Sequence, residues 1–113
     1  MPMTNTLNAT RWLDHLRVVI DDYDALVLDQ WGVLHNGKAP YPGVVETLDA
    51  LIAAGKPFVI LSNSGKRSGL NHARLAKLGF TPAVCERILT SGELTWRALA
   101  GQTDELSHIA DQR

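Results

Sequence analysis

The chain has 113 residues, of which 45% are hydrophobic and 20% are charged, and both values are typical of a single globular domain. Eleven lysines and arginines against twelve aspartates and glutamates leave a formal net charge of -1. This balance argues against a general affinity for nucleic acid or for an anionic membrane. Any anion that the protein binds must therefore be held by a local group of cations.

No apolar run is long enough to cross a bilayer, and the first residues lack the basic and apolar segments of a signal peptide. A single cysteine, Cys85, excludes an intramolecular disulfide and a zinc site built from several cysteines. These features predict a cytoplasmic protein in which Cys85 has no special role.

The first part of the chain predicts a helix, a strand and a loop. Apolar residues recur at helical spacing over 12–20, which predicts an amphipathic N-terminal helix within a segment 1–23. Residues 25–28 are apolar without interruption, as is typical of a strand covered on both faces in a parallel sheet. Residues 30–43 contain several glycines and prolines and are predicted to form a structured loop, with Pro42 in the first turn of the next helix.

Helices and strands then alternate as far as residue 101. A helix from Val44 should end at Gly55, and a strand over 57–61 should follow. A helix over 67–78, a short strand over 87–89 and a last helix capped by Ser91 complete the pattern. The buried positions expected in the helix over 67–78 are Leu70, Ala73, Leu75 and Leu78.

This alternation predicts an α/β fold with a Rossmann-like parallel sheet and right-handed crossovers. The core domain should span 24–101, and residues 102–113 should form a weakly ordered tail.

Polar side chains follow both of the first two predicted strands, and ligands of parallel sheets bind beyond the carboxyl ends of the strands. Asp29 follows the first strand, where a carboxylate serves as a nucleophile, as a metal ligand or only as a polar terminus. Ser62 and Asn63 end the second strand, where such groups bind anions or only cap the next helix. Lys66 and Arg67 would add local positive charge.

One apolar strand is followed by Asp-x-x-Gly-Val-Leu, and a second apolar strand ends in Ser-Asn. Together these two motifs resemble those of the haloacid dehalogenase (HAD) superfamily of hydrolases. The segments 41–43 (Tyr-Pro-Gly) and 89–93 (Leu-Thr-Ser-Gly-Glu) are similar to those of subclass IIA, which includes nucleotide and sugar phosphatases with a large cap. The form Asp-x-Trp-Gly-Val is similar to a poorly characterised branch of that subclass. The resemblance covers 24–99 and implies a HAD-like fold that is truncated before the cap and the second half of the core.

The resemblance also implies a role for each matched residue. Asp29 would attack the substrate and form an aspartyl-phosphate, and its other oxygen would bind Mg2+ together with the backbone carbonyl of Trp31. Ser62 would bind the phosphoryl group, with Asn63 shaping the same pocket, and Gly32 would let the chain turn sharply. The substrate would then be a small phosphorylated metabolite.

One departure from the family concerns proton transfer. Trp31 stands where the phosphatases have a second Asp as general acid and base, and an indole ring does not titrate near neutral pH. Dehalogenases of the superfamily also have an aromatic residue there, so a carbon-centred substrate is an alternative. His35 is a candidate replacement acid or base, although a histidine in a loop is more often a solvated bystander.

A second departure is the absence of the later Lys and acidic metal ligands of the family, which implies a weak or incomplete Mg2+ site and a chain that is incomplete or inactive alone. A non-catalytic interaction module derived from a HAD domain is the competing hypothesis, and a flavodoxin- or receiver-like domain with Asp29 as phosphoacceptor is a third. In the truncated sheet the strand over 25–28 would be an apolar edge, which predicts self-association or pairing with a separate fragment.

Overall fold

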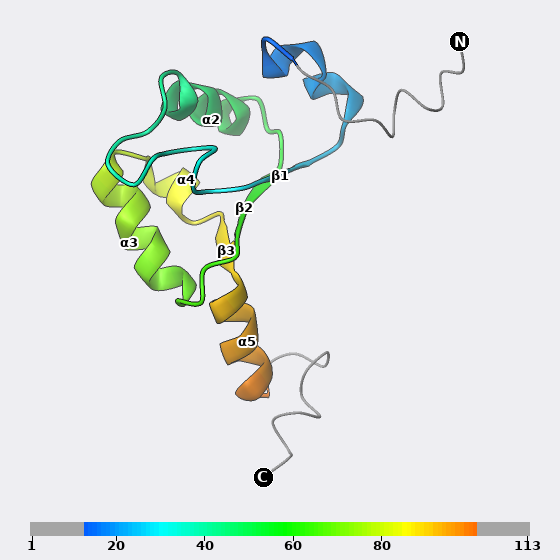
Figure 1. The fold of residues 1–113 in the computed structure, drawn as a ribbon. Coiled ribbons are helices and arrows are strands. Elements are labelled where there is room, and N and C mark those ends of the chain that lie inside the picture. The colour runs from blue at the N-terminus through cyan, green and yellow to red at the C-terminus, as the bar shows by residue number, and fades with distance from the viewer. Residues whose placement is uncertain (1–12, 102–113) are drawn as a thin grey trace.

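The computed structural model describes residues 13–101, which form a three-stranded parallel sheet with helices between the strands (Figure 1). This arrangement confirms the predicted α/β class and the Rossmann-like alternation. The strands are β1 (Leu26–Leu28), β2 (Phe58–Ser62) and β3 (Ile88–Thr90), and the α-helices are α2 (Val44–Ala53), α3 (Ser68–Leu78), α4 (Pro82–Cys85) and α5 (Ser91–Leu99).

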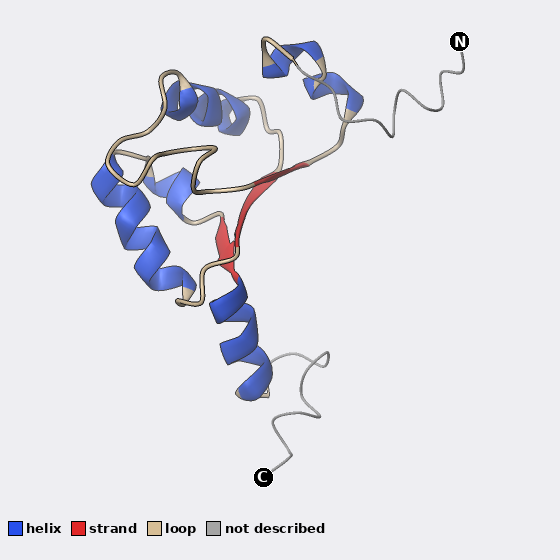
Figure 2. Cartoon of the chain, in the orientation of Figure 1, coloured by secondary structure: helices blue, strands red, loops and turns tan. Residues whose placement is uncertain are grey.

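The three strands lie in the order β1-β2-β3, so each crossover steps in the same direction across the sheet. Right-handed crossovers that step in one direction place all their helices on one face. Figure 2 shows α2, α3 and α4 on that face of the strands. The opposite face is open in the described part, where Val27 is 68% exposed and Leu61 is 44% exposed. The prediction that the strand over 25–28 is covered on both faces is therefore wrong for residues 13–101.

The hydrophobic core lies between the covered face of the sheet and the helices. Cys85 belongs to this core, and burial raises the pKa of its thiol, which makes the thiolate scarce at neutral pH. The buried residues of the core are Leu34, Leu48, Leu51, Phe58, Ile60, Leu75, Phe80, Val84, Cys85 and Ile88.

The N-terminal helix predicted over 12–20 is not an amphipathic α-helix in its described part. Two short 3-10 turns, Leu16–Val18 and Ile20–Asp22, take its place. Three consecutive β-branched residues, 18–20, disfavour an α-helix, because their side chains lose rotamer freedom against the preceding turn. Residues 1–12 and the tail predicted over 102–113 lie outside the described residues.

Three details of the later helices also differ from the sequence prediction. In α3 the side chains facing the core are Asn71, Leu75 and, partly, Leu78, while Leu70 and Ala73 are exposed because they project from other sides of the helix. The cap of α5 is Thr90, whose hydroxyl oxygen accepts a hydrogen bond from the Glu93 N–H, and Ser91 is the first helical residue.

In α2 the predicted first-turn residue, Pro42, precedes Gly43, which caps the helix at Val44. The predicted ends of the two crossover helices are confirmed, since Gly79 is the C-cap of α3 and Gly55 follows the C-cap of α2.

Strand β1 is an edge strand of the described sheet, as predicted. Self-association through this edge stays a prediction. Among residues 13–101, no helix combines the length and the apolar character needed to cross a membrane.

Candidate active site

The parallel register of β1 and β2 brings the two predicted strand ends to one edge of the sheet. Leu28 pairs with Ile60, so Asp29 directly follows the end of β1 while Ser62 is the last residue of the neighbouring β2. Asp29 is exposed, and its Oδ1 accepts a hydrogen bond of 2.9 Å from the N–H of Gln30. This bond fixes the orientation of the carboxylate, and no described residue hydrogen-bonds its second oxygen. An exposed, oriented carboxylate on a strand end has the geometry of a nucleophile or of a ligand for a hard cation.

Gln30 is a member of the site that the sequence interpretation missed. It is fully buried, and its Oε1 accepts a hydrogen bond of 3.4 Å from the Ser62 hydroxyl. The Ser62 Oγ in turn accepts a bond of 3.3 Å from the Ser64 N–H. Gln30 therefore connects the two strand ends, whereas Asn63 lies exposed beyond them. The one feature of the sequence that could have indicated this role is the position of the Gln30 amide directly after Asp29, in an otherwise apolar stretch.

The loop that follows β1 turns back on itself around His35. Gly32 has the positive φ of +79°, as expected for a sharp turn, and its N–H donates to the His35 carbonyl at 2.9 Å. His35 is fully buried, and its Nδ1 accepts a bond of 2.9 Å from the Gly37 N–H. Its ring meets the half-exposed indole of Trp31 edge to face, with 4.9 Å between the ring centroids.

The burial of His35 contradicts the expectation of a solvated loop histidine. Burial lowers its pKa, and the nearby positive charge of Arg74 lowers it further, so the imidazole is neutral at pH 7. Its position under Trp31 leaves it out of reach of a substrate. The structure therefore gives His35 a role in shaping the loop and argues against the replacement acid or base considered from the sequence.

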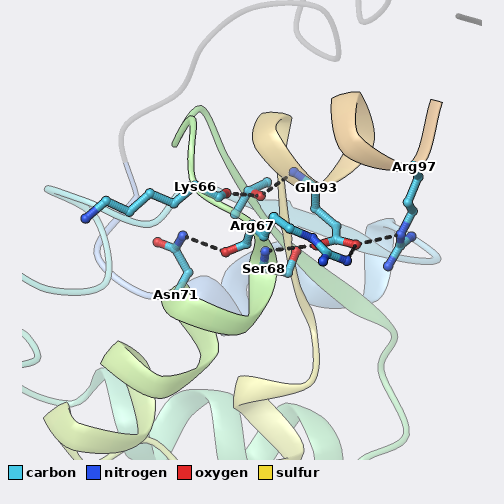
Figure 3. Close-up of polar contacts among 7 residues, drawn as sticks. Lys66, Arg67, Ser68, Asn71, Glu93 and Arg97 are labelled. Carbon is cyan, nitrogen blue, oxygen red and sulfur yellow. Dashed lines mark hydrogen bonds and ion pairs between the residues drawn. The ribbon is translucent and has the colours of Figure 1, made fainter. Parts of the chain in front are cut away.

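A carboxylate that the sequence interpretation did not single out fixes the loop after β2. Glu93, at 5% exposure, accepts hydrogen bonds of 3.0 and 3.1 Å from the guanidinium of Arg67 (Figure 3). It also accepts bonds from the Ser68 N–H at 3.2 Å and from Arg97 at 3.0 Å. The charge that Arg67 was expected to offer to an anion is thus neutralised by Glu93.

Backbone contacts strengthen the same connection between this loop and the start of α5. The Thr90 hydroxyl donates to the Lys66 carbonyl at 2.6 Å, and the Gly92 N–H donates to the Ser64 carbonyl at 3.0 Å. These residues lie far from the loop in sequence, which is why local patterns did not reveal the contact. We call this set of contacts between residues 64–68 and 90–93 the loop clamp.

The loop clamp should weaken in acid, because hydrogen bonds from Arg67 lower the pKa of the Glu93 carboxyl from 4.5 to about 2. A carboxyl whose pKa is lower in the folded state adds stability above its unfolded pKa and loses that stability as the pH falls through the folded value. We therefore expect the stability difference between the parent and Glu93→Gln to shrink between about pH 4.5 and pH 2. Urea denaturation of both proteins across this range measures it, and a difference that stays constant with pH would contradict the expectation.

The described residues offer few ligands for a metal ion. Within residues 13–101 no group of three or more His, Cys, Asp or Glu side chains is placed to hold one. The Asp29 carboxylate and the Trp31 carbonyl are hard oxygen donors, which suit a divalent cation in kind, but they are two where Mg2+ takes about six.

These strand ends and this fold define a HAD-like hydrolase core. A family model described as haloacid dehalogenase-like hydrolase matches residues 26–110, and the chain belongs to this family. The chain is 36% identical over 85 residues to chronophin of Rattus norvegicus, an alignment that covers 74% of this chain and 28% of chronophin. The family resemblance found in the sequence is confirmed.

Two solved structures share the fold. A haloacid dehalogenase-like hydrolase from Brucella suis 1330 is 29% identical, with a TM-score of 0.70. The match covers 80% of this chain and 33% of the hydrolase. The glycerol phosphate phosphatase of Mycobacterium tuberculosis, solved in complex with calcium, is 28% identical, with a TM-score of 0.59. This match covers 76% of this chain and 25% of the phosphatase. The chain thus spans about a quarter to a third of the length of these relatives.

Proposed function

We propose that this chain carries the nucleophile and the phosphoryl-binding loop of a HAD-type phosphatase. The observation that carries the proposal is the exposed Asp29 carboxylate, oriented by Gln30 beside the end of β2. Relatives that are named as phosphatases of glycerol phosphate support the same class of reaction. Ser62 and Asn63 would bind the phosphoryl oxygens. To donate to them, the Ser62 hydroxyl would turn away from the Gln30 side chain.

The first step follows from the geometry of Asp29. Its free carboxylate oxygen attacks phosphorus, the bond from phosphorus to the leaving oxygen breaks, and the leaving group takes the electron pair. Trp31 cannot supply a proton to that oxygen, and His35 is buried. The substrate should therefore be an ester whose leaving group departs as a stable anion, such as an aryl phosphate.

The second step, attack of water on the aspartyl-phosphate, also lacks a general base among these residues. General acid and base catalysis contributes about 10²–10⁴ in rate, so the covalent intermediate should accumulate. The expected result is a burst of about one p-nitrophenolate per chain from p-nitrophenyl phosphate, followed by slow turnover, with little release from glycerol 3-phosphate.

Asp29→Asn tests the nucleophile and should abolish the burst, because the amide is a poor nucleophile. A burst of equal size in this variant would contradict the proposal. Absence of a burst in the parent chain, with phosphate still bound, would favour the non-catalytic interaction module.

A divalent cation, which we propose to be Mg2+, would be held by Asp29 and the Trp31 carbonyl. When bound, it would offset the negative charge of the phosphoryl group. With only two protein ligands the ion would keep most of its water and bind weakly.

A further inference from the structure

A basic pocket lies beside the strand ends and contains neither Asp29 nor Ser62. Its volume is about 660 Å³, within the usual range for a small-molecule site. One wall is formed by α3, and the other by the loop after β1 together with the loop after β2. The residues that line it are Trp31, Gly37, Lys38, Ser64, Lys66, Leu70, Asn71, Ala73, Arg74, Lys77 and Leu78.

All the charged side chains that line this pocket are positive. Its lining includes four cations, Lys38, Lys66, Arg74 and Lys77, and no carboxylate. Within residues 13–101 the ion pairs join Glu93 to Arg67 and Arg97, so these four cations have no acidic partner there. In a chain of net charge -1, such a concentration of positive charge favours binding of an anion with several charges.

The pocket also holds a hydrogen-bond donor in a fixed place. The Ser64 Oγ accepts bonds from the Lys66 N–H at 3.1 Å and from the Asn71 side-chain amide at 3.2 Å. A hydroxyl has two acceptor positions and one proton, so the Ser64 proton remains available to a ligand. Asn71 is 4% exposed, so its side chain has little freedom to move away from Ser64. The loop clamp holds the backbone of the loop after β2, and Figure 3 shows its ion pair between Glu93 and Arg67.

The indole of Trp31 forms a rigid end to the pocket. A Cβ at Gly37 would overlap with the indole, so only glycine allows the ring to lie against the loop there. The Arg74 guanidinium lies over the same ring, 5.1 Å from its centroid, and His35 supports it from below. Arg74 is thus held at the pocket by the aromatic face rather than by a carboxylate.

We propose that this pocket binds a small anion bearing two adjacent phosphate groups, either as free diphosphate or as a diphosphate ester. Four cations match the charge of a diphosphate better than that of a single phosphate, and the Ser64 hydroxyl supplies a directed donor. A volume of this size suits a small molecule. The lining does not include Asp29, so binding of the anion would not require the nucleophile.

Isothermal titration calorimetry of the full chain in metal-free buffer tests the proposal. We expect inorganic pyrophosphate to bind at least tenfold more tightly than orthophosphate, and Arg74→Gln combined with Lys77→Gln to weaken pyrophosphate at least tenfold. Arg17→Gln, which removes an exposed charge outside the pocket, should leave the affinity within twofold. Equal weakening by Arg17→Gln, or equal binding of the two anions, would overturn the proposal, because either points to diffuse attraction.

Two further titrations locate the ligand and identify its form. Asp29→Asn should leave pyrophosphate affinity within twofold, and a larger change would place the anion at the strand ends and overturn the separate site. ADP compares an ester with the free ion: tighter binding of ADP assigns the pocket to a diphosphate ester, tighter binding of pyrophosphate assigns it to free diphosphate, and both uphold the proposal. Failure of the Asp29→Asn burst test would leave these results unaffected.

Discussion

Leu75→Ala should lower the free energy of unfolding by about 2–5 kcal/mol, since it removes a large aliphatic side chain from a close-packed core. Leu75 has no exposed surface and lies in the cluster formed by α3 and the covered face of the sheet. Because that sheet is covered on one face only, the described residues have few other layers to compensate for a cavity. Urea denaturation followed by circular dichroism measures the loss.

Leu70→Ala, five residues earlier in the same helix, is the matched control. Leu70 is 62% exposed, so the same truncation removes little buried surface and should change stability by no more than about 0.5 kcal/mol. Equal losses in the two variants would contradict the placement of α3. The sequence prediction took both leucines as buried, so the pair also tests where that prediction failed.

The error at Leu70 has a physical cause in the way α3 meets the sheet. Its core-facing positions include an asparagine, Asn71, which hydrogen-bonds to Ser64 and is buried although it is polar. A pattern based on apolar residues therefore assigned the buried stripe to a neighbouring position. Polar residues that are buried for a structural purpose cannot be recognised from hydrophobic periodicity alone.

The strand ends were predictable because their signals are local. An apolar run followed by Asp29, and a second followed by Ser62, places both residues at one edge of any parallel sheet. The loop clamp was not predictable in the same way, because Glu93 and Arg67 are brought together only by the crossover from β2 through α3 and α4 to β3.

His35 illustrates a third kind of difference. Its position in a loop rich in glycine and proline suggested solvent exposure, yet the turn at Gly32 folds it under the Trp31 ring. Burial by a loop that folds back on itself depends on tertiary contacts, here also with Phe80, that no short segment contains.

Gly92→Ala should destabilise the protein by about 1–3 kcal/mol and release the loop after β2. A Cβ at Gly92 would overlap with the Gly65 carbonyl and lie 2.6 Å from the Lys66 carbonyl oxygen. Both obstacles are backbone atoms, so relief requires α5 or the loop to move. Movement would break the bond from the Gly92 N–H to the Ser64 carbonyl, and amide hydrogen exchange over 64–68 should accelerate.

Gly69→Ala is the control that separates this contact from the general effect of replacing glycine in a helix. Both glycines are the second residue of a helix that begins with serine, but a Cβ at Gly69 meets nothing within 4 Å. Alanine has the higher helix propensity, so this variant should be neutral or more stable by up to about 1 kcal/mol. Stability changes of opposite sign in the two variants, at equivalent helix positions, would identify the loop clamp as the cause of the loss at Gly92. Equal effects would mean that α5 does not hold the loop, and the donor at Ser64 would then lack a fixed place.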